Sequence, residues 1–271
     1  MPLIIFSHAN SFPVATYSVM LASLKARGYT VEAIDKLGHD PQYPVTNNWP
    51  HLVQQLADFT TAAVQKHGEP AYLVGHSLGG FLSLMTAAGH ADLARGVLLL
   101  DSPIVGGWRA TTLGAFKRAQ MVEVVSPGKV SRTRRNHWAD QAAALAHFQG
   151  KKAFARWEPQ VLQDYIAHGT HDAEEKRVLS FDRAIETAIY NTFPDNLERL
   201  LHKQPLKCPA AFIGGTHSAE MRQIGMAMTQ KITKGRIMML DGSHLFPMEK
   251  PLATAAAIEA ALRNIEPAAS A

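Results

Sequence analysis

One short segment constrains the fold of this chain more than any other. Residues 71–74 are apolar, residues 75–80 have the sequence Gly-His-Ser-Leu-Gly-Gly, and residues 81–88 continue with an apolar helical pattern. This order predicts a strand, a sharp turn and a helix, with Ser77 in the turn. Only glycine avoids a Cβ clash two residues before and two residues after a serine held in such a strained turn. The segment therefore predicts a serine hydroxyl raised clear of a β-sheet.

The same turn favours negative charge close to Ser77. The N–H of Leu78 and the start of the helix point to the place where charge develops when a serine attacks a carbonyl. Because so short a pattern also occurs by chance, the alternative is a serine on an ordinary strand-to-helix turn. The apolar strand, the helix and partner residues later in the chain favour the catalytic interpretation.

Strand and helix patterns alternate along much of the chain. Strands are expected at residues 3–6, 29–34, 96–100, 210–213 and 236–240, in addition to the one before Ser77. Helices are expected at residues 15–27, 50–66 and 251–265, with another that ends near residue 232. This alternation predicts an α/β fold with a mostly parallel sheet flanked by helices. Active-site groups should then gather at the carboxyl ends of the strands.

The pattern changes between residues 104 and 204. Strand-like runs disappear, helical segments such as residues 141–148 and 160–168 follow one another, and three of the four tryptophans fall in this stretch. An insertion at this point would lie over the carboxyl edge of the sheet and exclude water from a pocket. We therefore expect a core of residues 1–103 and 205–271 and an inserted helical cap of residues 104–204.

The composition limits the class of protein and the cellular compartment in which it is expected. The chain has 271 residues, of which 46% are hydrophobic and 18% charged, and no apolar run approaches the roughly 20 residues of a membrane helix. The single cysteine, Cys208, excludes an internal disulfide and fits a reducing compartment. The first residues have the pattern of a strand rather than of a signal peptide. We expect a cytoplasmic protein without membrane association.

The excess positive charge lies in the middle of the chain. Residues 104–207 contain 16 Lys and Arg against 11 Asp and Glu, whereas the net charge of the whole chain is +4. The cluster Lys129, Arg132, Arg134 and Arg135 would favour an anionic substrate or partner, but a solvated loop is the favoured interpretation. No interleaved aromatic residues or nucleic-acid motif accompany the cluster, so no nucleic-acid partner is expected.

These features together resemble the α/β-hydrolase fold, and its capped members in particular. The resemblance rests on the GHSLGG segment, on an early strand that runs into His8-Ala9-Asn10, and on a late strand that runs into Gly242-Ser243-His244. It covers nearly the whole chain except the cap. It implies a serine nucleophile, an acid and a histidine base in that chain order, with Ser77 first and His244 last. Among 13 histidines, His244 is the best base because it follows the last strand and precedes an apolar Leu-Phe-Pro run.

The resemblance also implies an oxyanion hole. In such hydrolases the loop after the early strand supplies a second backbone donor, often after a His-Gly pair, and His8-Ala9 stands at that place. The next N–H group, from Asn10, is the candidate donor together with that of Leu78. A purely structural polar loop is the alternative.

The acid is where the sequence departs from the common family pattern. The loop after the penultimate strand, where an aspartate is usual, has no carboxylate before Glu220. Some members, including a branch of the haloalkane dehalogenases, instead place the acid after the strand that follows the elbow helix, and Asp101 occupies that place. We favour Asp101 over Glu220, with Asp35 and Asp241 as weaker candidates.

The resemblance implies hydrolysis of a small carboxylic ester or related acyl compound through an acyl-enzyme on Ser77. Cleavage of a carbon–carbon bond or a lactone on the same triad, or a non-catalytic ligand-binding role, stay open. No metal set or phosphate-binding motif is evident, so no cofactor or metal is expected. Oligomeric state cannot be predicted from the sequence. The residues expected to line the substrate pocket are Phe12, His76, Trp108 and Phe246.

Overall fold

A computed structural model describes residues 1–119 and 128–266, apart from the side chains of Trp108 and Arg118. Six strands form the main sheet: β1 (Leu3–Ser7), β2 (Thr30–Ile34), β3 (Ala71–His76), β4 (Ala94–Leu100), β8 (Ala210–Gly215) and β9 (Ile237–Leu240). Their order across the sheet is β2-β1-β3-β4-β8-β9, and every neighbouring pair is parallel. The predicted parallel α/β sheet is confirmed.

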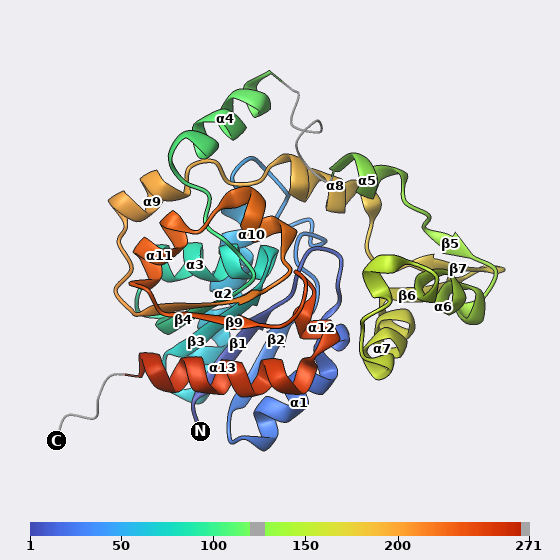
Figure 1. Ribbon diagram of the computed structural model, residues 1–271, viewed down its shortest axis with the longest axis horizontal. Helices are drawn as coiled ribbons and strands as arrows, with labels where there is room; N and C mark the ends of the chain where they lie inside the picture. Colours follow the sequence, from blue (N-terminus) through green and yellow to red (C-terminus); the bar gives the residue numbers. More distant parts are fainter. Residues whose placement is uncertain (120–127, 267–271) are drawn as a thin grey trace.

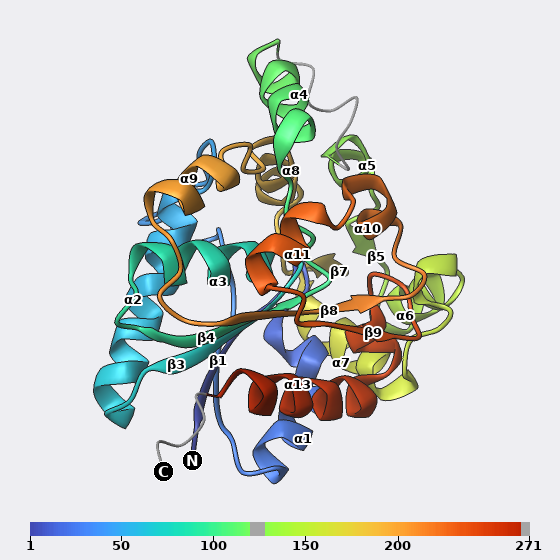
Figure 2. The ribbon, with the colours of Figure 1, turned by 60° about the vertical axis from the view of Figure 1, so that its left-hand side comes forward.

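Helices cover both faces of this sheet (Figure 1). The helices and 3-10 turns that lie outside the insertion are η1 (Val14–Tyr17), α1 (Ser18–Ala26), α2 (Pro50–His67), α3 (Leu78–Gly89), α10 (Ala219–Ile224), α11 (Ala227–Thr233), α12 (Phe246–Glu249) and α13 (Pro251–Ile265). Figure 2 shows α1 and α13 on one face of the sheet and α2, α3 and α11 on the other. The sheet is therefore the middle layer of three.

Burial on both faces explains why the central strands are apolar runs rather than alternating patterns. In β1, Leu3 and Ile5 belong to the core cluster on the α2 and α3 side, whereas Ile4 and Phe6 belong to the cluster on the α1 and α13 side. All four side chains are fully buried. Successive residues of a strand point to opposite faces, so a sheet covered on both sides needs apolar residues at every position.

Two predicted helices are interrupted. The predicted helix over residues 15–27 is a 3-10 turn, η1, followed by α1, and the helix expected to end near residue 232 is split into α10 and α11. Gly225 lies between α10 and α11 with φ 78°, a conformation that breaks an α-helix and that glycine adopts without strain. The predicted core strands begin and end within two residues of the observed ones, and the helices predicted over residues 50–66 and 251–265 within one residue. The helix predicted over residues 81–88 begins three residues earlier, at Leu78.

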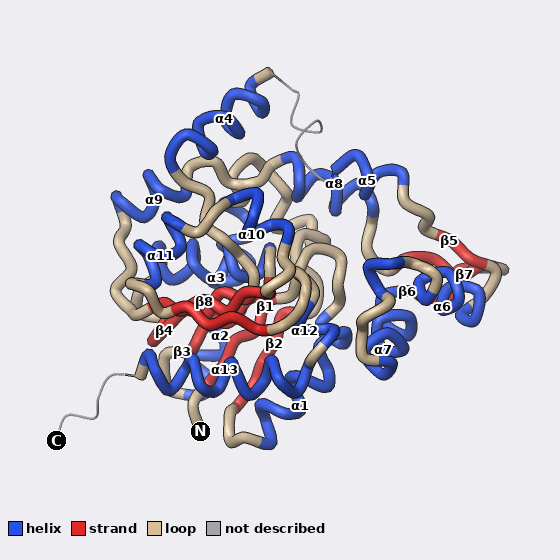
Figure 3. Tube along the Cα trace, in the orientation of Figure 1, coloured by secondary structure: helices blue, strands red, loops and turns tan. Residues whose placement is uncertain are grey.

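The insertion after β4 contains α4 (Gly107–Arg118), α5 (Gly128–Thr133), α6 (Gln141–Gln149), η3 (Lys152–Phe154), α7 (Pro159–Gly169), α8 (Arg183–Asn191) and α9 (Leu197–Lys203). It also contains a three-stranded antiparallel sheet in the order β5-β7-β6, from β5 (His137–Trp138), β6 (Thr170–Ala173) and β7 (Lys176–Leu179). These strands lie apart from the main sheet (Figure 3). Most of the elements in this stretch are helices, as expected, but the expectation that strand-like runs disappear from it is wrong.

Buried Arg177 explains the small sheet. Its guanidinium donates to the Thr170 hydroxyl at 2.7 Å and to the backbone carbonyls of Ile166, Ala167 and Thr170. These bonds tie β7 and β6 to the end of α7. Strands were expected where the sequence has apolar runs, and a strand that contains a charged residue such as Arg177 does not show such a run.

The parallel topology changes direction between β1 and β3. The chain passes from β1 to β2 at one edge and then returns to build β3 and β4 on the other side of β1. Open parallel sheets bind ligands in the crevice at such a switch point, at the carboxyl ends of the strands. Among the described helices, none has both the length and the apolar character that crossing a membrane requires.

Candidate active site

Ser77 lies in the turn between β3 and α3, at the sheet's switch point. Its φ and ψ are 52° and −115°, outside the regions that a non-glycine residue prefers, and the residue is partly exposed. Its carbonyl oxygen accepts hydrogen bonds from the N–H of Gly80 at 3.0 Å and from the Ser102 hydroxyl at 2.9 Å. These contacts fix the strained backbone and leave the hydroxyl at the carboxyl edge of the sheet.

The predicted need for glycine around Ser77 is confirmed. A Cβ atom on Gly75 would lie 2.1 Å from the carbonyl oxygen of Gly79, and one on Gly79 would lie 2.0 Å from that of Ser7. Both distances are far below contact, and both neighbours are backbone atoms that cannot rotate away. The turn is therefore packed directly against the end of β1 and the loop that follows it.

The loop after β1 brings Asn10 to the same edge of the sheet. Asn10 is buried, and its side-chain amide donates to the backbone carbonyl of Glu186 in α8 at 3.1 Å. Within the described residues, the Asn10 N–H donates to no other backbone group. The Leu78 N–H is the first of α3, whose geometry leaves its first N–H groups without intrahelical acceptors. Among the residues that the structure describes, neither predicted oxyanion donor, the Asn10 N–H or the Leu78 N–H, donates to a backbone acceptor outside the regular elements.

His8 keeps this loop in place through neutral hydrogen bonds. Its Nδ1 donates to the Ala9 carbonyl at 2.7 Å, and its Nε2 accepts from the Leu37 N–H at 3.0 Å. Complete burial lowers the pKa of His8 to about 4, so the ring stays neutral near pH 7. The geometry gives His8 a structural role.

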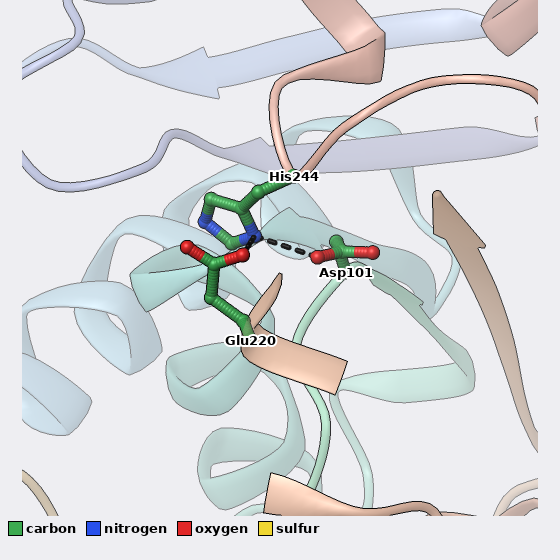
Figure 4. Close-up of side chains that lie close together, drawn as sticks. All are labelled: Asp101, Glu220 and His244. Carbon is green, nitrogen blue, oxygen red and sulfur yellow. Dashed lines mark hydrogen bonds and ion pairs between the residues drawn. The ribbon is translucent and has the colours of Figure 1, made fainter. Parts of the chain in front are cut away.

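Asp101 and His244 meet at the ends of β4 and β9, as Figure 4 shows. The Nδ1 of His244 lies 2.6 Å from Oδ2 of Asp101, whose side chain is fully buried. The carboxylate also accepts from the Gly215 N–H at 2.8 Å and from the Ser218 hydroxyl at 2.6 Å. Of the four acids considered, Asp101 is therefore the one hydrogen-bonded to the imidazole.

Glu220 lies near the same nitrogen without a hydrogen bond to it. Its Oε2 is 3.8 Å from Nδ1 of His244, and its side chain is 43% exposed (Figure 4). Glu220 and Asp101 also form, with His244, a group whose ligand atoms lie within 4.8 Å of one another. However, two atoms bound to one metal ion are about 3 Å or more apart, because each bond is about 2 Å long. The 2.6 Å contact is a direct hydrogen bond.

The protonation states of His244 and Asp101 depend on each other. Burial alone would lower the pKa of His244, but the hydrogen bond to Asp101 and the charges of Glu220 and Asp101 outweigh it and raise this pKa above 6.5. Burial alone would raise the pKa of Asp101, but the hydrogen bond and charge of His244, then Ser218 and Gly215, lower it. Asp101 is thus ionised near pH 7 and accepts the Nδ1–H of His244, which leaves Nε2 free to take a proton.

Ser77 follows β3 and His244 follows β9, and the two loops lie close together in space. Among the hydrogen bonds of the described residues, none joins these two side chains. The link is His76, whose Nε2 donates to the His244 carbonyl at 2.9 Å and whose ring centroid lies 5.1 Å from that of His244. The loop that carries the imidazole is therefore fastened to the residue directly before Ser77.

Of the expected pocket residues, the three with described side chains, Phe12, His76 and Phe246, do not gather into one lining. His76 is completely buried with both ring nitrogens hydrogen-bonded, so the prediction that it lines a pocket is not supported by its position. Phe246 is also completely buried, in the core beside His76. Phe12 is partly buried against Trp157 and Tyr165, and the side chain of Trp108 lies outside the described part of the chain. Sequence position alone placed His76 and Phe246 too close to the solvent.

Tyr17 is a site residue that sequence analysis missed. Its hydroxyl accepts from the Ala9 N–H at 3.1 Å and donates to Nδ1 of His76 at 2.8 Å. The hydrogen bonds from Ala9 through Tyr17 and His76 to His244 form a relay. Burial, and after it the charge of the nearby His244, lowers the pKa of His76 to about 3, so the His76 ring in this relay stays neutral. The relay joins the loop of Asn10 to the loop of His244. In the sequence, Tyr17 is one apolar position of an amphipathic helix, which gives no signal for a polar role.

Two cavities at the insertion have linings without Ser77 or His244. One, of about 700 Å³, lies between α4, α9 and α11 and is lined by Glu198, Arg199 and Lys231 among others. The other, of about 800 Å³, lies between the loop after β2 and the β7 to α8 segment, where Lys36, Arg132 and Arg183 contribute to the lining.

Comparisons with known proteins agree with this fold. A family model described as the alpha/beta hydrolase family matches residues 4–257. The fold is similar to that of E-2-(acetamidomethylene)succinate hydrolase, with a TM-score of 0.72, 20% identity, and coverage of 97% of this chain and 91% of that chain. A search of curated sequences finds no match.

Two further solved structures have the same fold. The peroxisomal alpha-beta-hydrolase Lpx1 from Saccharomyces cerevisiae has a TM-score of 0.72 and 16% identity, with 99% of this chain and 78% of that chain covered. The M. tuberculosis esterase Rv0045c has a TM-score of 0.66 and 18% identity, with 97% and 85% covered. At these identities the likeness concerns the fold alone.

Proposed function

The chain belongs to the alpha/beta hydrolase family, and from this premise we propose that it is a serine hydrolase that cleaves a small carboxylic ester or related acyl compound. The observation that carries the proposal is the pairing of Asp101 with His244 at 2.6 Å, beside a serine in a strained turn. A buried carboxylate that fixes an imidazole with Nε2 free is the arrangement that activates a serine hydroxyl.

The proposed first step forms an acyl-enzyme. Nε2 of His244 takes the hydroxyl proton of Ser77 while the serine oxygen forms a bond to the substrate's carbonyl carbon. The N–H groups of Asn10 and Leu78 donate to the resulting oxyanion, and each such donor is worth roughly 10²-fold to 10³-fold in rate. The carbon–oxygen bond to the alcohol then breaks, and the alcohol leaves with the proton from His244.

The proposed second step releases the acid. Water gives a proton to His244 and attacks the acyl carbon, and the serine oxygen leaves with the proton that His244 returns. Asp101 keeps its negative charge throughout and stabilises the imidazolium. Serine rather than aspartate in the turn favours acyl transfer to water over the alkyl-enzyme chemistry of dehalogenases and epoxide hydrolases.

Labelling with a fluorophosphonate probe tests the proposal. The protein should form one covalent adduct, which peptide mass spectrometry should map to Ser77, because only an activated serine attacks the phosphorus atom. The matched variant Ser77→Ala should not label, and Ser83→Ala, which removes a buried α3 hydroxyl that has no hydrogen-bond partner among the described residues, should still label.

An adduct on another serine, or no adduct on folded protein, would contradict the proposed nucleophile. No adduct, together with ligand binding, would support the non-catalytic alternative. Cleavage of a carbon–carbon bond or a lactone uses the same nucleophile and is separated from ester cleavage by turnover assays.

A further inference from the structure

Glu249, the last residue of α12, is a buried acid to which the proposed mechanism gives no role. Among the residues that the structure describes, three acids are buried: Asp101, Glu186 and Glu249. The side chain of Glu249 is only 3% exposed. Burial of a carboxylate is costly unless hydrogen-bond donors or an opposite charge compensate it, so its partners indicate what it does.

Both oxygens of Glu249 accept hydrogen bonds from Ser243, the residue directly before His244. The Ser243 hydroxyl donates to Oε1 at 2.5 Å, and the Ser243 N–H donates to Oε2 at 3.2 Å. One carboxylate thus holds the backbone and the side chain of the same residue. The direction in which the chain enters His244 is therefore fixed by Glu249.

The Ser243 hydroxyl also binds the residue after His244. The Leu245 N–H donates to Oγ of Ser243 at 3.1 Å, while Oγ donates to Glu249. In addition, the Glu249 N–H donates to the Leu245 carbonyl at 3.1 Å. Glu249 is therefore connected to both chain neighbours of His244. Among the hydrogen bonds of the described residues, none joins it to the imidazole.

The insertion supplies an opposite charge for this carboxylate. Nη2 of Arg156, in the segment between η3 and α7, lies 3.5 Å from Oε2 of Glu249, and the Arg156 side chain is 49% exposed. Two residues further on, the Glu158 N–H donates to the Met248 carbonyl in α12 at 3.0 Å. The insertion is thus attached to the core at α12, and water screens the ion pair there.

We propose that Glu249 is a positioning residue, which holds the loop of His244 through Ser243. The held loop keeps Nδ1 of His244 within hydrogen-bond distance of Asp101. This inference rests on the proposed function, in which His244 is the base. A displacement of about 1 Å in a catalytic group costs about 10²-fold in rate, so the support of this loop matters for the reaction.

Neutral substitutions at Glu249 and Ser243 test the inference. Glu249→Gln offers one acceptor oxygen to the two donors of Ser243, and Ser243→Ala removes the hydroxyl that joins Glu249 to Leu245. With a neutral 4-nitrophenyl ester, each variant should lower kcat by about tenfold to a hundredfold. KM should change little, because a displaced base weakens the transition state rather than substrate binding. Circular dichroism checks that both variants fold.

Two control variants separate the hydrogen bonds to Ser243 from the charges nearby. Arg156→Gln removes the ion pair to Glu249 and leaves the bonds between Glu249 and Ser243 in place. Asp241→Asn removes an exposed carboxylate of the same loop, which pairs with Lys250 and Arg156. Both should keep kcat within about fivefold of wild type, since exposed ion pairs contribute little.

Proton NMR provides a measurement that needs no turnover. The Nδ1–H of His244, hydrogen-bonded to Asp101, should give a downfield resonance that His244→Gln removes. The resonance should be unchanged in Ser77→Ala. It should move upfield or broaden in Glu249→Gln and Ser243→Ala, because the hydrogen bond to Asp101 loosens when the loop is no longer held.

Wild-type kcat and an unchanged resonance in folded Glu249→Gln and Ser243→Ala would overturn the inference. A lower Tm with wild-type kcat would overturn it as well, because the two residues would then only stabilise the fold. A changed resonance in a protein that neither labels at Ser77 nor cleaves esters would support the positioning and contradict the proposed function. Where Glu249→Gln does not fold, Ser243→Ala decides by the same measurements.

Discussion

His244 lies between two carboxylates of different character. Asp101 is fully buried and accepts three hydrogen bonds, whereas Glu220 is 43% exposed and makes none to the imidazole. A buried, hydrogen-bonded carboxylate holds a ring in one orientation and one tautomer. An exposed carboxylate at 3.8 Å acts mainly through its charge, which water screens.

The two carboxylates should therefore respond differently to neutral substitution. Asp101→Asn should lower kcat by about 10³-fold to 10⁴-fold, because an amide favours the wrong imidazole tautomer. Glu220→Gln should lower kcat by less than about tenfold, since no hydrogen bond to the imidazole is lost. Both are measured with a neutral 4-nitrophenyl ester, with circular dichroism as the check on folding. A larger loss for Glu220→Gln would assign the acid to Glu220.

The raised pKa of His244 predicts the pH dependence. The active form has neutral His244, so kcat/KM should rise with pH and its inflection should lie above pH 6.5. Glu220→Gln should move the inflection to lower pH, because the carboxylate charge favours the protonated ring. The measurement is kcat/KM from about pH 5 to pH 9. A flat profile over this range would count against His244 as the base.

At the scale of elements, the turn before α3 packs against the end of β1. Missing Cβ atoms at Gly75 and Gly79 permit backbone contacts that no other residue allows. The same contact holds the loop of Asn10 beside the N-terminus of α3, so close packing and the two proposed oxyanion donors have one cause. The relay from Ala9 through Tyr17 and His76 to His244 adds the loop after β9 to this assembly.

Substitution of Gly79 tests this packing. Gly79→Ala should reduce the free energy of unfolding by about 1–3 kcal/mol or more, because its Cβ would lie 2.0 Å from the Ser7 carbonyl oxygen. Gly89→Ala, at the last position of the same helix, has its nearest contact at 3.9 Å and should be neutral or stabilising by up to about 1 kcal/mol. Urea denaturation measures both. Equal stabilities of the two variants would contradict the packing argument.

At the scale of the whole molecule, the insertion is joined to the core by aromatic packing. The ring centroid of Phe12, in the loop after β1, lies 5.7 Å from that of Trp157 and 5.6 Å from that of Tyr165. These contacts and the bond from Asn10 to Glu186 connect the proposed oxyanion loop to residues of α7 and α8. The border of a cap domain at residues 104 and 204 stays a prediction.

The sequence by itself determined the parallel α/β class and the hydrolase family, because apolar strand runs and a glycine-flanked serine are local patterns with few structural solutions. It also reduced the acid to a short set of candidates. It missed β5, β6 and β7, whose residues are largely polar and whose anchor is a buried arginine.

Only the tertiary structure decided which carboxylate meets His244, that His76 is buried, and that Arg134 alone turns inward from a basic cluster. The physical reason is that a side chain's direction and burial depend on neighbours far away in sequence. Asp101 and His244 are 143 residues apart, and the identity of such neighbours is not encoded in any local pattern.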